Sequence, residues 1–317
     1  MDIEILLFLQ EFRSGPGKIL ADFLLKMTFL SEVSSVLVIL AVVYWCVDKN
    51  FGTYLLMGWS GNRLVNGFLK VTACVYRPWV RDARILPYGD SMKTATGYSF
   101  PSGHTMNAAS VYGGPALRKE LPKALRITLA SMVVLVAFSR NYLGVHTPQD
   151  VLVGAVAGLS VMWAAGKMMR YLEKEPGKEV LLLVLGLCLA AAIAVYAYVK
   201  PYPIDYNEAG ELIVDGAEMA NDTFKGIGWC SAFLIGWFLE KCYVGFTTKL
   251  SMEQRISRMV CGLLGYYAGS LILVPLIKTM ITGPAGTVIS CFLQMFYISF
   301  LFPLMMKRLE SRKEKDK

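Results

Sequence analysis

The sequence predicts an all-α fold, namely a polytopic helical membrane protein with about nine transmembrane helices. Apolar residues make up 55% of its 317 residues, charged residues only 18%, and the mean hydropathy is +0.47. A soluble protein of this size would carry more charge. The apolar residues also form blocks long enough to cross a bilayer, where backbone polar groups must be paired within a helix.

The first 30 residues are expected to lie at the membrane surface. Residues 2–12 mix acids with Ile, Leu and Phe at helical spacing, which is typical of an interfacial helix. The Gly-Pro-Gly sequence at 15–17 should end it. The next apolar segment, 18–30, is short and carries Asp22 and Lys26, so we expect it to be interfacial or re-entrant. A basic region followed by a small-residue cleavage site is missing, so we expect no cleaved signal peptide.

The following blocks have the length and composition of membrane-crossing helices. They are predicted near residues 32–47, 51–73, 102–117, 124–141, 149–171, 179–199, 224–244, 257–277 and 285–306. Within the fifth of them, Gly154 and Gly158 form a small-xxx-small pattern that allows two helices to pack closely.

Charge predicts the orientation of these helices. The net charge is +8, and most lysines and arginines fall in connections on one predicted side and in the tail 307–317. The 200–222 connection on the other side is acidic. Because cytoplasmic loops carry the excess of Lys and Arg, we expect a cytoplasmic C-terminus and an N-terminus outside. The basic tail suits anionic headgroups, and without a folded basic domain no nucleic-acid partner is expected.

Cysteine usage predicts no metal site. The seven cysteines are scattered, mostly inside apolar blocks, and no pair has metal-ligand spacing. They are expected to be small buried side chains.

Lys70 and the pair Arg77-Pro78 form the first polar motif, at the end of the predicted helix 51–73. Residues seven apart in a helix lie two turns apart on one face, roughly 10 Å along the axis. Both cations are therefore expected on one side of the helix. A lysine at the end of a span can also extend to the interface for solvation alone, so that interpretation stays open.

The second motif, Pro101-Ser102-Gly103-His104, is expected to open a helix after a polar loop. Helix N-termini present unpaired N–H groups and a positive dipole end, which suit a phosphate. Gly103 would let the backbone approach such a ligand, and Ser102 would donate a hydrogen bond. A helix cap alone also explains Pro101 and Ser102, but it gives no reason for His104.

The third motif contains Arg140, His146 and Asp150. Arg140 offers a planar fork for two phosphate oxygens. An unprotonated His146 could attack phosphorus, with Asp150 holding its other ring N–H. Thr147-Pro148 also resembles a helix start in which Asp150 only caps, and both roles could coexist.

These motifs contain both histidines of the chain and resemble the type 2 phosphatidic acid phosphatase superfamily. Its three-part pattern matches without a substitution, as Lys70-x6-Arg77-Pro78, Pro101-Ser102-Gly103-His104 and Ser139-Arg140-x5-His146-x3-Asp150. The resemblance covers roughly residues 50–170. Vanadium-dependent haloperoxidases share this site but are soluble, so the predicted spans argue against them.

The resemblance implies a metal-independent phosphatase that needs no cofactor. In that family His146 would attack phosphorus and become a phosphohistidine, Asp150 would orient it, and His104 would protonate the leaving alcohol. The residues expected to bind the phosphoryl oxygens are Lys70, Arg77, Ser102, Gly103 and Arg140.

The resemblance also implies the substrate class and the division of the chain. We expect a lipid phosphate such as phosphatidate, or a polyprenyl diphosphate. A glucose-6-phosphatase-like enzyme is the alternative, because it shares the helix count and orientation, and a non-catalytic lipid transporter with a relic site is a third. The expected division is an interfacial region (1–30), a core of about six helices with all motifs (31–175), further transmembrane helices (176–306) and a cytoplasmic tail (307–317).

The implied location is an integral protein of the plasma membrane, or of the endoplasmic reticulum in a eukaryote, with its site on the non-cytoplasmic side. Arg63 and Asn66 precede Lys70 in the same predicted helix. A charge at that depth usually faces a cavity or a partner, so Arg63 is expected either to line the polar interior beneath the site or to pair structurally.

Overall fold

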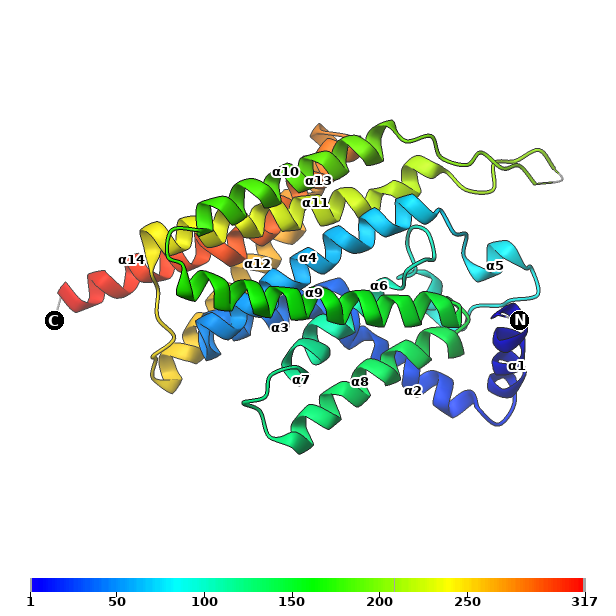
Figure 1. The fold of residues 1–317 in the computed structure, drawn as a ribbon, viewed down its shortest axis with the longest axis horizontal. Helices are drawn as coiled ribbons and strands as arrows, with labels where there is room; N and C mark the ends of the chain where they lie inside the picture. The colour runs from blue at the N-terminus through cyan, green and yellow to red at the C-terminus, as the bar shows by residue number, and fades with distance from the viewer. Residues whose placement is uncertain (1, 208, 316–317) are drawn as a thin grey trace. The chain divides into compact units, whose positions relative to one another are not determined.

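The computed structural model describes residues 2–207 and 209–315, with the side chains after residue 310 left out. Within those ranges the chain is helical and forms no strand, only an isolated antiparallel bridge between Tyr206 and Leu212. The helices (Figure 1) are α1 (Asp2–Ser14), α2 (Lys18–Thr28), α3 (Val33–Val42), α4 (Lys49–Ala73), α5 (Pro78–Arg81), α6 (Gly103–Ala108), α7 (Gly114–Ala116), α8 (Lys123–Tyr142), α9 (Pro148–Lys174), α10 (Glu179–Val199), α11 (Gly216–Leu239), α12 (Met252–Met280), α13 (Gly283–Phe296) and α14 (Phe302–Lys315).

Each predicted block has a helical counterpart, but nine membrane crossings are not confirmed. Among the described residues, five helices are long and apolar enough to cross a membrane, namely α8, α9, α10, α12 and the helix Gly283–Glu310. A sixth crossing is counted if Lys18–Ser31 and Val33–Val47 form one span, bent by 51° at their junction. The remaining blocks are more polar or shorter: α4 carries Arg63 and Lys70, and α6 and α7 are short pieces.

Helix α11 begins earlier than the sequence predicts, at Gly216 rather than near residue 224. The Asp215 carboxylate accepts hydrogen bonds from the backbone N–H groups of Ala217 (2.8 Å) and Glu218 (3.4 Å). These are the unpaired donors of a helix start, which an Asp at this position satisfies. Asp222, expected in an acidic loop, therefore lies in a helix. Glu208 of that loop, and the side chains of the tail from residue 311, lie outside the described residues.

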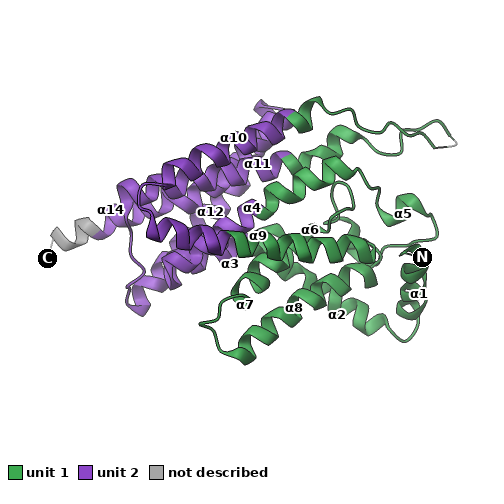
Figure 2. Cartoon of the chain, in the orientation of Figure 1, with its two compact units in different colours: residues 1–36, 62–164, 196–223 green, residues 37–61, 165–195, 224–317 purple. Residues whose placement is uncertain are grey.

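Two compact units interleave along the sequence (Figure 2). Unit 1 comprises residues 1–36, 62–164 and 196–223, and it contains every residue of the three motifs. Unit 2 comprises residues 37–61, 165–195 and 224–317. The four-part division of the chain given above stays a prediction.

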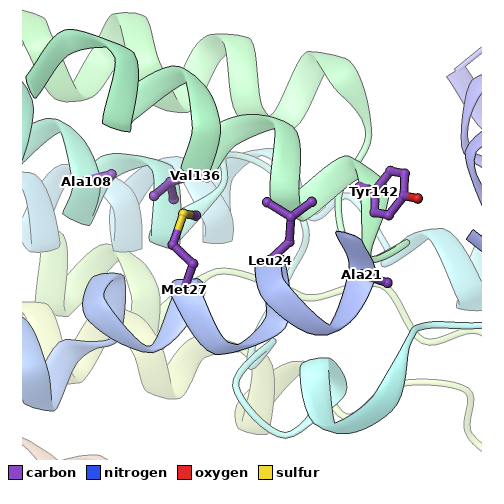
Figure 3. Packing of buried hydrophobic residues seen from close by; sticks show 6 residues of the cluster. All are labelled: Ala21, Leu24, Met27, Ala108, Val136 and Tyr142. Atoms are coloured by element: carbon purple, nitrogen blue, oxygen red, sulfur yellow. The ribbon is translucent and has the colours of Figure 1, made fainter. Parts of the chain in front are cut away.

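In unit 1, α2 packs its apolar face against α8 (Figure 3). Residues three apart on a helix share a face, and those of α2 at this spacing are buried. The cluster consists of Ala21, Leu24, Met27, Ala108, Val136 and Tyr142. The Tyr142 hydroxyl also donates to the Gly17 carbonyl (3.0 Å), in the Gly-Pro-Gly turn that ends α1. Segment 18–30 is thus part of the packed core of unit 1.

Helix α1 is attached to the loop that follows α5. The buried Arg13 guanidinium donates to the carbonyl of Tyr142 (2.6 Å) and to that of Leu86. Gln10 Nε2 donates to the Arg84 carbonyl (3.0 Å), and Gln10 Oε1 accepts from Leu86 N (2.8 Å). Because Arg13 bonds to both Tyr142 and Leu86, it fixes the loop beside the end of α8.

Helix α9 approaches α6 closely because it carries two glycines on one face. A Cβ on Gly154 would lie 3.0 Å from the Ser102 carbonyl oxygen, and one on Gly158 would lie 2.7 Å from the Ala109 Cβ. Asn62 of α4 joins the same contact, since its Nδ2 donates to Ser110 Oγ (2.8 Å) and to the Gly158 carbonyl (3.2 Å). The small-xxx-small pattern therefore brings the second and third motifs together.

Unit 2 is held by buried polar side chains among apolar ones. Lys49 Nζ pairs with Glu240 Oε1 at 2.7 Å, and the Glu240 side chain is almost fully buried. Trp45 Nε1 donates to the Ile298 carbonyl (2.9 Å), and Arg258 donates to the carbonyl of Trp45 (3.0 Å). These bonds offset the cost of burying charge away from water.

We expect Gly158→Ala to destabilise the protein by about 1–3 kcal/mol, because the added methyl meets the rigid Ala109 Cβ. Gly269→Ala is the matched control, since a Cβ there has no described atom within 4 Å and Ala favours a helix. Thermal unfolding of the detergent-solubilised protein measures both. Equal midpoints for the two variants would refute the close approach of α9 to α6.

Candidate functional site

The loop that carries His146 is formed by the end of α8 and the start of α9. Helix α8 ends at Tyr142, and Gly144 then adopts φ +77°, a conformation that favours glycine. The Arg140 carbonyl accepts from the backbone N–H groups of Val145 (3.1 Å) and His146 (3.3 Å). This turn folds His146 back toward α8, while Pro148 begins α9.

Asp150 holds this loop through one carboxylate oxygen. Its Oδ2 accepts from Ser99 Oγ (2.6 Å) and from the backbone N–H of Thr147 (2.8 Å), and it lies 3.3 Å from His146 Nδ1. The Thr147 contact is a helix cap, and the His146 contact fits an orienting role. The Asp150 side chain thus makes the contact that each of the two interpretations left open by the sequence requires. Ser99, which the sequence did not single out, adds a third contact.

The other ring nitrogen of His146 faces Arg77. Arg77 Nη1 lies 2.9 Å from His146 Nε2. A guanidinium only donates, so Nε2 accepts and the proton of the neutral ring is assigned to Nδ1, beside Asp150. Burial, and then the charge of Arg77, lower the pKa of His146 below its ordinary value. The buried His146 is therefore neutral at physiological pH, the state a nucleophile requires.

Lys70 and Arg77 meet, but not as successive turns of one helix. Helix α4 ends at Ala73, and Arg77 has an extended backbone (φ −64°, ψ 151°) as the residue before α5. The expected two-turn spacing is wrong because α4 ends four residues before Arg77, where Cys74 adopts φ +48°, and because a residue that precedes proline is disfavoured in the helical region. The two cations converge on the Thr96 carbonyl instead, which accepts from Lys70 Nζ (2.9 Å) and Arg77 Nη2 (2.5 Å).

Arg77 is fixed on every side by the protein. Its Nε donates to the Gly97 carbonyl (3.0 Å) and its Nη1 to the Val145 carbonyl (3.2 Å). Burial lowers the pKa of Arg77 to about 10, so it stays charged at neutral pH.

Arg140 differs from Arg77 in having no such bonds. It is fully buried, and none of its three guanidinium nitrogens has a hydrogen-bond partner among the described residues. Glu32 attracts it and Arg77 repels it, but only through space. Leaving charged donors buried and unpaired is costly, so this guanidinium fits an anion with several acceptor oxygens.

The second motif adjoins the third through the backbone. Ser102 N donates to the Asp150 carbonyl (2.9 Å), and Ser102 caps α6 because its Oγ accepts from Thr105 N (3.4 Å) and Thr105 Oγ1 (3.0 Å). His104 is buried and its Nε2 has no hydrogen-bond partner within the described part of the chain. Arg140, His146 and Arg77 all act on it electrostatically.

Arg63 and Asn66 lie next to Gly103. A Cβ on Gly103 would be 3.4 Å from Asn66 Oδ1 and 3.5 Å from Arg63 Nη1. Asn66 Nδ2 donates to the Pro101 carbonyl (3.0 Å), and both side chains are buried. Arg63 thus belongs to the polar interior of unit 1 next to the second motif.

All residues of the three motifs therefore lie in unit 1, where a buried cationic cluster contains Lys70, Arg77, His104, Arg140 and His146. Sequence reasoning missed three residues that hold the cluster together, namely Ser99 and Asp222 through their side chains and Thr96 through its backbone carbonyl. Of the three, only Asp222 was recognisable in the sequence, as an acidic residue four positions after Glu218 and directly before an apolar block. Ser99 and Thr96 belong to an irregular segment without periodicity.

Two family models match the chain. The PAP2 superfamily model matches residues 35–174, and a model for the transmembrane extension of PAP2 superfamily phosphatases matches residues 224–314. Residues 35–174 therefore belong to the PAP2 superfamily and residues 224–314 to the transmembrane extension of its phosphatases, and the chain is an all-α integral membrane protein.

Two curated relatives are similar over part of the chain. Phosphatidylglycerophosphatase B of Bacillus subtilis (strain 168) is 39% identical over 116 residues, which are 34% of this chain and 53% of the relative. An undecaprenyl-diphosphatase of Sulfolobus acidocaldarius is 41% identical over 63 residues, which are 20% of this chain and 30% of the relative. The chain thus spans about half the length of the first relative and less than a third of the second. No solved structure matches the chain.

We expect His146 to stay neutral, with its proton on Nδ1, down to about pH 5, because burial and Arg77 disfavour the imidazolium. The chain has only two histidines, so nitrogen NMR of a His104→Gln variant with labelled histidine follows His146 alone. A titration midpoint near the ordinary value of about 6.5 would contradict the buried contact with Arg77.

Proposed function

We propose that this protein is a metal-independent phosphatase that hydrolyses a phosphate or diphosphate ester of a membrane lipid through a phosphohistidine at His146. One observation carries the proposal: His146 has Asp150 on Nδ1 and a cation on Nε2. This arrangement supports a neutral, oriented nucleophile whose reactive nitrogen already faces a group that binds phosphate.

The reaction would proceed in two displacements. The Nε2 lone pair of His146 attacks phosphorus, the bond from phosphorus to the ester oxygen breaks, and His104 gives that oxygen a proton. A water oxygen then attacks phosphorus, the bond from phosphorus to Nε2 of His146 breaks, His104 takes a proton from the water, and inorganic phosphate leaves. A histidine that changes role in this way needs a freely available ring nitrogen, which fits the unpartnered Nε2 of His104.

The cations would neutralise the transferred group. Phosphoryl transfer depends mainly on positioning and on stabilising charge spread over three oxygens. Arg140 has unpaired donors for them, and Lys70, Arg77, Ser102 and Gly103 are the further proposed ligands. Arg77 Nη1 would exchange Nε2 of His146 for a phosphoryl oxygen when substrate binds, which frees the nitrogen that attacks.

A lipid substrate is favoured by the relatives, whose names refer to phosphatidylglycerophosphate and undecaprenyl diphosphate. A lipid headgroup also lies at the depth where membrane helices end. We further propose that the site faces the non-cytoplasmic side and that the C-terminus is cytoplasmic, because Lys and Arg are concentrated in connections on the opposite side.

We expect the purified protein to release phosphate from phosphatidate, phosphatidylglycerophosphate or undecaprenyl diphosphate faster than from glucose 6-phosphate. The rate should be the same in the presence and in the absence of EDTA. His146→Ala should lower kcat by about a thousandfold or more, because it removes the nucleophile. His104→Ala should lower it by about a hundredfold, because it removes the proton donor.

Lys93→Ala is the control, since Lys93 is exposed and pairs only with Asp90 in the described residues. Preference for glucose 6-phosphate would support the sugar-phosphate alternative, and lipid transfer without phosphate release would support a transporter. Loss of activity in EDTA that metal restores would overturn the mechanism. The same assay in sealed right-side-out vesicles, with a substrate that does not cross them, tests the side of the membrane.

A further inference from the structure

Lys70 is held by an acid that lies far away in the sequence. Its Nζ is 2.9 Å from Asp222 Oδ2, and the two side chains are only 4% and 6% exposed. Taking both charges out of water is costly, so such a pair persists only where geometry and further hydrogen bonds compensate. Those further bonds exist here and lead to the other cation of the first motif.

The backbone of α11 is fastened to α4 beside this pair. Thr223 Oγ1 donates to the Gly67 carbonyl (2.9 Å), and a Cβ on Gly67 would lie 2.6 Å from the Thr223 Cα. Such close contact requires glycine on α4. It places Asp222 next to Lys70, which lies one turn after Gly67.

Thr96 connects the acid to both cations. Its Oγ1 lies 3.1 Å from each Asp222 carboxylate oxygen, while its carbonyl accepts from Lys70 and Arg77. The adjacent Gly97 has φ +66°, and a Cβ there would lie 2.8 Å from Asp222 Oδ2 and 3.2 Å from Lys70 Nζ. Asp222 is therefore built into the segment that fixes Lys70 and Arg77.

We propose that Asp222 is a positioning residue that keeps Lys70 protonated and directed at the phosphate, so that α11 completes the phosphate site. An ammonium has three N–H donors, of which Asp222 and Thr96 take two, and the third is left for a phosphoryl oxygen. Without a neighbouring carboxylate, a buried ammonium readily loses its proton and with it the attraction to an anion.

Asp222 lies between the two stretches that the family models match, 35–174 and 224–314. Its role rests on the proposed function, since Lys70 is a phosphate ligand only in that proposal. The proposed role of Asp222 gives residues 175–223, which join the two matched stretches, a part in the reaction.

The test compares full-length Asp222→Asn and Asp222→Glu with wild type and with Glu218→Gln in detergent. Glu218 is the matched control, an exposed acid one turn earlier on α11. For each protein, kcat/KM for phosphatidate and the affinity for orthovanadate, a phosphate-shaped anion whose binding needs no turnover, are measured from about pH 6 to about pH 9. Thermal unfolding checks that each variant is folded.

Asp222→Asn keeps a hydrogen-bond acceptor but loses the charge. We expect its kcat/KM and its orthovanadate affinity, each divided by the wild-type value at the same pH, to fall by about tenfold or more as the pH rises from about 6 to about 9. Asp222→Glu should keep the wild-type pH dependence even if its activity is lower at every pH. Glu218→Gln should match wild type throughout. If Asp222→Asn does not fold, a changed pH dependence in Asp222→Glu overturns the proposal.

Profiles of Asp222→Asn parallel to wild type would overturn the positioning role while leaving the phosphatase intact. A third outcome is that wild type binds orthovanadate and Asp222→Asn changes the pH dependence of that binding as expected, but wild type releases phosphate from no ester. In that case the proposed function fails and the role of Asp222 stands. A wild-type protein that binds no orthovanadate overturns both.

Discussion

The contact between Arg77 Nη1 and His146 Nε2 is the interaction on which the rest of the site depends. It joins two segments that are 69 residues apart, and because a guanidinium only donates, it makes Nε2 of His146 the acceptor. Arg77 reaches this position because α4 ends before Pro78 and because the guanidinium donates to the carbonyls of Gly97 and Val145. To deliver His146, α8 must end in a tight turn at Gly144 and α9 must start with the carboxylate of Asp150 in place.

A second constraint is the concentration of positive charge away from water. Lys70, Arg77 and Arg140 are all buried in unit 1, and like charges so enclosed repel one another. Asp222 offsets this repulsion at Lys70 and Asp150 does so near Arg77, whereas Arg140 has no partner bonded to it in the described chain. Lys70 and Arg77 thus have partners bonded to them among the described residues, and in the proposed function the unpartnered Arg140 binds the phosphoryl group.

Much of this arrangement could be predicted from the sequence. The fixed spacing of rare residues such as histidine indicates which side chains take part in the site, but it does not indicate the path of the backbone between them. The helical blocks and the motifs beside His104 and His146 were predictable in this way. The path from Lys70 to Arg77 was not, since helical periodicity carries no information once the chain leaves the helix. Asp222 was placed in a loop because its charge lowered the apolar signal, and only tertiary contact with Gly67 and Lys70 shows why a charge is buried there.

The most direct test of the account is an experimental structure with orthovanadate bound in the full-length protein. We expect vanadium at covalent distance from His146 Nε2, its oxygens bonded to the guanidinium of Arg140, and Arg77 Nη1 moved from the imidazole to an oxygen. Orthovanadate bound elsewhere, or at this site with His146 still bonded to Arg77 and Arg140 unpaired, would contradict it.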